Sequence, residues 1–129
     1  GVVATIKGEG SSKSGELAAW RLLEQYPEMD AVFVANDQMA LSMLSVARAK
    51  GRNVPRDLAV VGFDGLPESA YFSPPLTTVH QDLHELGYRA VQQLIDMIDS
   101  SRNSIAREPV TTWLQPELLV RESSSRAHG

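Results

Sequence analysis

Cysteine is absent from this 129-residue sequence, and so are several other features. Without thiols, disulfide bonds, thiolate metal sites and cysteine nucleophiles are excluded. No apolar run approaches the roughly 20 residues that a helix needs to cross a bilayer. The first residues lack the basic region of a secretory signal peptide. We therefore expect a cytoplasmic protein with no membrane partner.

An excess of positive charge is also missing. The chain has 12 Lys and Arg residues against 16 Asp and Glu residues, which gives a formal net charge of −4. Proteins that bind nucleic acid on their own usually carry a basic patch or stripe, so the charge argues against that class. Hydrophobic residues make up 43% of the chain, an ordinary value for one globular domain with a modest core.

Recognisable catalytic motifs are missing as well. There is no G-x-S-x-G elbow and no carboxylate pair in a known arrangement. The loop Lys7–Gly15 fails the dinucleotide pattern, because Lys13 stands where that pattern needs a glycine, and Ser12 before Lys13 breaks the P-loop pattern. A turn with a serine N-cap is the plain alternative for this loop. Asp64 could act as a general base, but no acid partner is identifiable.

A metal site is considered because two histidines, His80 and His84, lie close to Asp82 and Glu85. Histidines four residues apart share a face only when both lie on a helix, and His80 precedes the expected helix cap at Asp82. We therefore expect no metal site, no cofactor and no enzymatic activity.

The stretch 31–65 is expected to form a strand, a helix and a second strand. Its apolar runs are Ala31–Ala35 and Leu58–Phe63, and helical spacing lies between them over Gln38–Lys50. A crossover of this kind makes the two strands parallel. Ligands of open parallel sheets bind at the carboxyl ends of the strands, so Asn36 and Asp64 are candidate ligand contacts.

Each polar residue at these strand ends also has a structural explanation. Asp37 and Asp82 are suited to helix capping. Asn36 and Asp64 are equally suited to turns in which the side chain bonds its own backbone.

The remaining elements follow from local patterns. A continuous apolar stripe identifies the clearest helix, and its members are Leu83, Leu86, Ala90, Val91, Leu94, Ile95 and Ile98. The expected strands are Val2–Ile6, Leu76–Val79, Val110–Leu114 and Leu118–Val120; the expected helices are Glu16–Tyr26, a short turn within Leu66–Phe72, and Asp82–Ile98; Glu122–Gly129 is expected to be a frayed tail.

Five motifs together resemble one family. They are VANDQMAL (34–41), VPRDLAVVGFDG (54–65), PPLTTVHQD (74–82), ELGYRAVQQLI (85–95) and ELLVRES (117–123). In this order and spacing they resemble the C-terminal half of the effector-binding core of lactose/galactose-repressor-type (LacI/GalR) bacterial transcriptional regulators. The resemblance implies an α/β fold like that of type I periplasmic binding proteins, with a parallel doubly wound sheet in each of two subdomains around a cleft.

The resemblance also implies roles for particular residues. Asn36, Asp64 and Gln81 match family positions that contact the effector, often a sugar or a purine. The loop containing Gly10 and Ser11 matches a ligand-binding segment. Gly10 stands where the family has an aromatic residue that stacks on the ligand, and Gly65 replaces a second aspartate. The glycine in place of the stacking residue implies a different effector, or a stacking platform supplied from elsewhere.

The family pattern divides the chain into three parts. Residues 1–80 would belong to the C-terminal subdomain, without its first strand and helix. Residues 81–115 would cross to the N-terminal subdomain, and residues 116–129 would supply a returning strand and a disordered tail. DNA would be contacted only through a helix-turn-helix outside this sequence. The stripe on residues 83–98 would lack its natural sheet, so we expect it to pack against residues 1–80 or a second copy.

A homodimer is expected from the same resemblance, with contacts from the helix after VAND and the segment after GFD. The predicted interface residues are Met39, Met43, Tyr71, Phe72 and Leu76. Exposed, the last three would form an apolar patch typical of an interface; the alternative is burial under a loop.

We therefore predict the effector-sensing and dimerisation portion of a LacI-type regulator that binds a small, sugar-like molecule. One alternative is a fragment of a periplasmic-type solute-binding protein. Another is a small α/β hydrolase or phosphatase.

Overall fold

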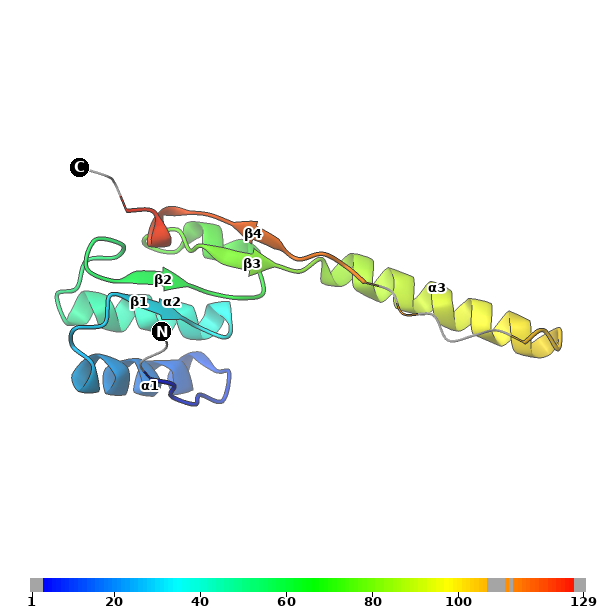
Figure 1. Ribbon diagram of the computed structural model, residues 1–129, viewed down its shortest axis with the longest axis horizontal. Helices are drawn as coiled ribbons and strands as arrows, with labels where there is room; N and C mark the ends of the chain where they lie inside the picture. Colours follow the sequence, from blue (N-terminus) through cyan, green and yellow to red (C-terminus); the bar gives the residue numbers. More distant parts are fainter. Residues whose placement is uncertain (1–3, 107–110, 112, 127–129) are drawn as a thin grey trace. The chain divides into compact units, whose positions relative to one another are not determined.

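The computed structural model describes residues 4–106, 111 and 113–126 (Figure 1). The chain divides into two compact units, residues 1–80 together with 117–129, and residues 81–116. The α/β class with parallel strands, predicted from the sequence, is confirmed.

The first unit is built on two parallel strands, β1 (Ala31–Phe33) and β2 (Ala59–Val61), whose register pairs Phe33 with Val61. The pairing continues beyond β1, where the Val34 amide donates to the Val61 carbonyl over 2.8 Å. The helix α2 (Asp37–Ala49) connects the two strands, as the apolar pattern predicts.

Two helices, α1 (Ser12–Gln25) and α2, pack against each other (Figure 1). They approach closely at Gly15, where an added Cβ would lie 2.8 Å from the Cα of Met39. The core of the first unit collects apolar side chains from both helices, from β2 and from the loops, namely Ala19, Leu23, Ala40, Met43, Leu44, Val46, Ala47, Leu58, Val60 and Leu76.

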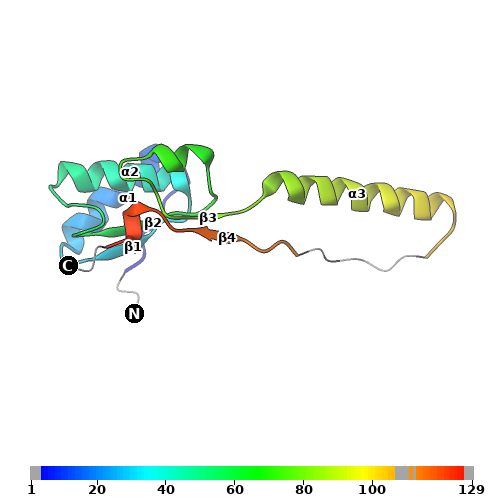
Figure 2. The ribbon, with the colours of Figure 1, turned by 90° about the horizontal axis from the view of Figure 1, so that it is seen from above.

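A second strand pair in this unit is antiparallel: β3 (Thr78–His80) lies beside β4 (Glu117–Leu119) (Figure 2). Two parallel bridges, Val61 with Thr77 and Asp64 with His80, join the chain around β3 to the chain after β2. Between β2 and β3 lies η1 (Pro67–Tyr71), a 3-10 helix that begins with proline at its first turn.

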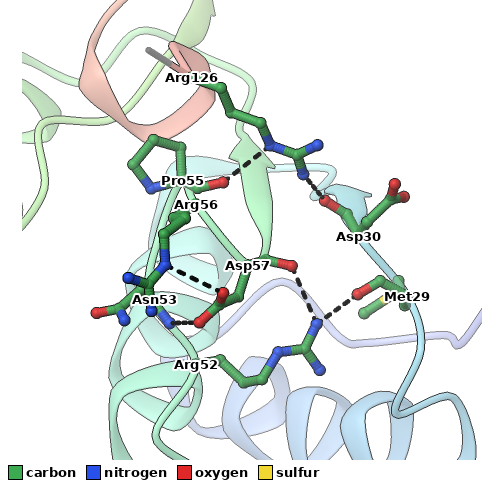
Figure 3. A network of polar contacts seen from close by, with 8 residues as sticks. All are labelled: Met29, Asp30, Arg52, Asn53, Pro55, Arg56, Asp57 and Arg126. Carbon is green, nitrogen blue, oxygen red and sulfur yellow. Dashed lines mark hydrogen bonds and ion pairs between the residues drawn. The ribbon is translucent and has the colours of Figure 1, made fainter. Parts of the chain in front are cut away.

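The segment after β4 is ordered, contrary to the predicted frayed tail. Residues Glu122–Ser124 form a 3-10 helix, η2, and Ser123 is fully buried. The guanidinium of Arg126 donates to the carbonyl oxygens of Pro55 and Asp30 (Figure 3). The prediction was wrong because serine-rich composition does not reveal these distant partners. Residues 127–129 lie outside the described residues.

Two predicted strands differ from the structure. Residues 4–6 of the expected strand Val2–Ile6 are not in a strand, and its residues 2 and 3 lie outside the described residues. In the expected strand Val110–Leu114, residues 111, 113 and 114 are not in a strand, and residues 110 and 112 are outside the described part. An apolar run of five residues becomes a strand only where a neighbour accepts its backbone hydrogen bonds.

The second unit contains α3 (Leu83–Arg102), four residues longer than predicted at its C-terminal end. Its N-cap is Asp82, as predicted, and the Asp82 Oδ1 accepts from the Glu85 amide over 2.9 Å. None of its residues is buried, and the apolar stripe is exposed along its length. The expected packing of this stripe against residues 1–80 or a second copy stays a prediction. Among the described residues, no helix is both long and apolar enough to span a bilayer.

Candidate functional site

The carboxyl ends of β1 and β2 place two predicted ligand residues at the same edge. Phe33 and Val61 are paired, and the chain runs three residues beyond each of them to Asn36 and Asp64. Since the strands are parallel, both segments leave the sheet at the edge where ligands bind in open α/β folds.

Asn36 has a structural role that uses both ends of its amide. Its Oδ1 accepts from the Met39 amide over 2.8 Å and so caps α2, while its Nδ2 donates to the Gly10 carbonyl over 2.9 Å. The second bond brings the loop around Gly10 to the strand edge. Asn36 is therefore the cap of α2, and the alternative assignment of this role to Asp37 is wrong.

Gly10 and Ser11 form the turn before α1. Gly10 has a φ of +89°, which a residue with a Cβ rarely adopts. The Ser11 Oγ accepts from the Ser14 amide over 3.1 Å, so the predicted serine N-cap is confirmed. The Gly10 carbonyl bonds to Asn36, which places both members of this loop beside a predicted ligand residue.

Asp64 lies in an unusual backbone conformation, with a φ of 113°, and Gly65 follows with a φ of +71°. A residue other than glycine held there costs on the order of 1–3 kcal/mol, and such strain is concentrated at functional sites. Partial burial, and after it the negative charge of Asp37, raises the pKa of the Asp64 carboxyl above its ordinary value. Its carboxylate can accept charge-assisted hydrogen bonds from hydroxyl groups.

Asp37 is the site residue whose role the sequence did not reveal. It is fully buried, and its two carboxylate oxygens accept from the Thr78 hydroxyl over 2.7 Å and from the Leu66 amide over 2.8 Å. Gly62 lies against it, because an added Cβ there would overlap the Asp37 Oδ1. One signal was present: Asn36 alone is sufficient to cap the helix, so the adjacent Asp37 was available for another role.

Gln81, the third predicted effector contact, is the first residue of the second unit and is partly buried. It directly follows His80, whose Cα would lie 2.6 Å from a Cβ added at Gly65. Its contact with an effector stays a prediction.

The predicted interface residues occupy different environments. Met43 and Leu76 are buried in the core of their own chain, so they are corrected from interface to core residues. Met39 is half-buried, with its side chain next to Gly8 and Gly15, and Phe72 packs against the core. Tyr71 is 88% exposed.

The side chains predicted to bind a ligand at this edge carry polar groups. They offer amide and carboxylate groups of the kind that pair with hydroxyl-rich molecules. Within residues 4–106, 111 and 113–126, no group of three or more His, Asp or Glu side chains is arranged to hold a metal ion. A separate hollow of about 400 Å³ lies at the other end of α2, bordered by Arg48, Phe72 and Pro74.

Nearly the whole chain is similar to a known protein family and to a named repressor. A family model described as a periplasmic binding protein-like domain matches residues 2–124. The lactose operon repressor of Klebsiella pneumoniae is 41% identical over 120 residues, which are 93% of this chain and 32% of that repressor. The chain spans about a third of the length of the curated relatives it matches.

Solved structures of a transcriptional regulator and a repressor also match this chain. A complex of the transcriptional regulator CelR with cellobiose matches with a TM-score of 0.82 and 40% identity, covering 90% of this chain and 34% of that chain. A lac repressor dimer bound to operator and the anti-inducer ONPF matches with a TM-score of 0.79 and 32% identity, covering 91% of this chain and 34% of that chain.

Proposed function

Since the chain belongs to the periplasmic binding protein-like domain family, we propose that it is the effector-sensing portion of a LacI-type transcriptional regulator. It would form the C-terminal half of the effector-binding core. The observation that carries the proposal is the shared strand edge, where Asn36 and Asp64 follow paired strands in a chain similar over 90% of its length to a regulator–cellobiose complex.

The effector is proposed to be a small, hydroxyl-rich molecule such as a sugar. Asp64 would accept hydrogen bonds from its hydroxyl groups, and Gln81 would supply an amide. The side chain of Asn36 already bonds to Gly10 and Met39, so Asn36 would serve chiefly by holding the Gly10–Ser11 loop at the edge.

Effector binding would act on DNA through a conformational equilibrium. A ligand that bridges two subdomains favours the closed arrangement by its differential affinity for the two states. A helix-turn-helix elsewhere in the complete protein would read this change as altered DNA affinity. Residues 81–115 are proposed to belong to the other subdomain.

A solute-binding protein is the alternative with the same fold. The relatives favour the regulator, because those matched here are named as a repressor and a transcriptional regulator. Their names also describe regulators rather than enzymes, in keeping with a binding role for this chain.

Ligand-induced stabilisation tests the proposal. Cellobiose, lactose and a panel of other sugars and purines would be added to this chain and to the complete protein that we propose contains it. A ligand at 100 times its Kd stabilises the fold by about 2.7 kcal/mol, which gives a clear rise in Tm.

The matched variants are Asp64→Asn and Asp30→Asn. Asp30 is exposed and lies at the opposite, amino end of β1. We expect Asp64→Asn to weaken binding about ten-fold or more, and Asp30→Asn to leave binding unchanged. Absence of any ligand response in the complete protein, or equal affinity of the Asp64→Asn variant, would count against the proposal.

A further inference from the structure

The turn that carries Asp64 is held by hydrogen bonds from outside the turn. Its three successive amides all have acceptors: the Asp64 amide donates to the Val79 carbonyl over 3.0 Å, the Gly65 amide to the Thr78 Oγ1 over 3.2 Å, and the Leu66 amide to the Asp37 Oδ2 over 2.8 Å. Two of these three bonds lead to one buried carboxylate, because the Thr78 hydroxyl in turn donates to the Asp37 Oδ1.

The number of donors and acceptors explains why a carboxylate is needed. Three donors converge here, the Thr78 hydroxyl and the amides of Gly65 and Leu66, and three acceptor oxygens receive them. Asp37 supplies two of these oxygens and Thr78 supplies the third. Asparagine would supply only one oxygen at position 37. Since Asp37 and Thr78 are fully buried, water could not replace the lost bond.

The turn needs this support because its conformation is unfavourable by itself. Asp64 and Gly65 have consecutive positive φ angles of 113° and 71°. Without the bonds to Asp37 and Thr78, the backbone at Asp64 would relax toward the common regions of negative φ. The Asp64 side chain would then leave the strand edge in a different direction.

We infer that Asp37 is a positioning residue for Asp64. Its buried carboxylate, acting directly on Leu66 and through Thr78 on Gly65, fixes the backbone from which the Asp64 carboxylate meets an effector. This inference rests on the proposed effector site. Asp37 itself touches no effector, because its side chain is completely covered by the protein.

Amide hydrogen exchange of the folded protein tests the inference without any ligand. In Asp37→Asn we expect the amides of Gly65 and Leu66 to exchange at least about ten times faster. The amide of Val34, which donates to Val61 in the neighbouring strand, is expected to keep its rate. A uniform increase that includes Val34 would show a merely structural role and would overturn the inference, as would unchanged rates at Gly65 and Leu66.

Thr78 provides a second set of variants, in case Asp37→Asn does not fold. Thr78→Val removes the hydroxyl and is expected to speed exchange at Gly65, whereas Thr78→Ser keeps the hydroxyl and is expected to retain the original rate. Failure of serine to restore the rate would contradict the inference.

Affinity for cellobiose and lactose, measured by calorimetry well below the Tm of each variant, gives the functional readout. We expect Asp37→Asn and Thr78→Val to weaken binding about ten-fold or more and Thr78→Ser to bind normally. If these variants bind as tightly as the unmodified protein, the inference is wrong. If the unmodified protein itself binds no sugar or purine, the proposed function fails, and the exchange pattern still decides whether Asp37 holds the turn.

Discussion

Asp64 has a positive backbone φ, and the pKa of its carboxyl is raised above the ordinary value. Each of these features is energetically unfavourable for an ionised aspartate. Both have a physical cause in its neighbours, since the turn is held by Asp37 and Thr78, and since burial and the charge of Asp37 disfavour its ionised form. A residue that a fold keeps at such a cost is a reasonable candidate for binding.

The pKa of Asp64 predicts a particular dependence of stability on pH. Because this pKa is higher in the folded state than the ordinary value of 3.8, Asp64 favours folding below that pH and loses this contribution as the pH rises through the raised pKa. We therefore expect Asp64→Asn to be more stable than the unmodified protein at pH 7, with a difference that shrinks below pH 3.8. Urea unfolding between pH 3 and pH 7 measures this difference.

Asp57 supplies a control, because its contribution to stability is expected to change with pH in the opposite direction. The Asn53 amide and, to a smaller extent, Arg56 hold the pKa of Asp57 below its ordinary value. Asp57→Asn should therefore be less stable than the unmodified protein at neutral pH, and this loss should disappear on acidification. An Asp64→Asn curve parallel to that of the unmodified protein would contradict the assignment.

At the scale of elements, the segment after β4 ties separate parts of the first unit together. The Ser123 Oγ accepts from the Thr77 amide over 2.8 Å and donates to the Val60 carbonyl over 2.6 Å, so one side chain joins β2 to the chain leading into β3. Arg126 reaches the carbonyls of Pro55 and Asp30 at the amino ends of the strands (Figure 3).

Ser123→Ala is expected to destabilise the protein by about 1–3 kcal/mol, because it leaves a buried amide without its acceptor. The midpoint of urea unfolding measures the loss. Ser125→Ala is the matched control, since Ser125 is exposed and its hydroxyl donates to the Arg121 carbonyl, and it should change stability by less than about 0.5 kcal/mol. Equal effects of the two substitutions would refute the importance of the buried serine.

At the scale of the whole molecule, self-association depends on what the surface exposes. Of the five residues predicted for a dimer contact, two are core and two are partly covered within the chain, which leaves Tyr71 as the exposed member of the predicted contact. A homodimer stays a prediction for this chain, which is similar to a solved lac repressor dimer.

Tyr71→Asp is therefore expected to raise the dimer dissociation constant at least about 30-fold, the effect of losing roughly 2 kcal/mol at an interface. Sedimentation velocity over a range of concentrations measures this change. Leu17→Asp is the control, because Leu17 is an exposed apolar residue on α1, outside the predicted contact. Unchanged sedimentation of the Tyr71→Asp variant at high concentration would argue against this interface.

The sequence by itself determined the elements whose signals are local. Apolar runs and helical spacing predicted β1, α2 and β2, and a capping residue marked the start of α3 at Asp82. The first helix was predicted from Glu16, whereas α1 begins four residues earlier, at Ser12. Parallel pairing followed from the crossover, and with it the strand edge that gathers Asn36 and Asp64. These features depend on residues that are a few positions apart or on the direction of the chain. Both can be read from the sequence.

The tertiary structure alone decided which side chains are enclosed and what they bond to. Asp37 reaches Leu66 and Thr78, which are 29 and 41 residues away, and Ser123 reaches Val60 across 63 residues. The apolar face of α2 likewise could not reveal that Met43 faces its own core rather than a second copy. A local pattern shows that one face of a helix or strand is apolar and is expected to be buried. Only the tertiary structure shows which residues bury it.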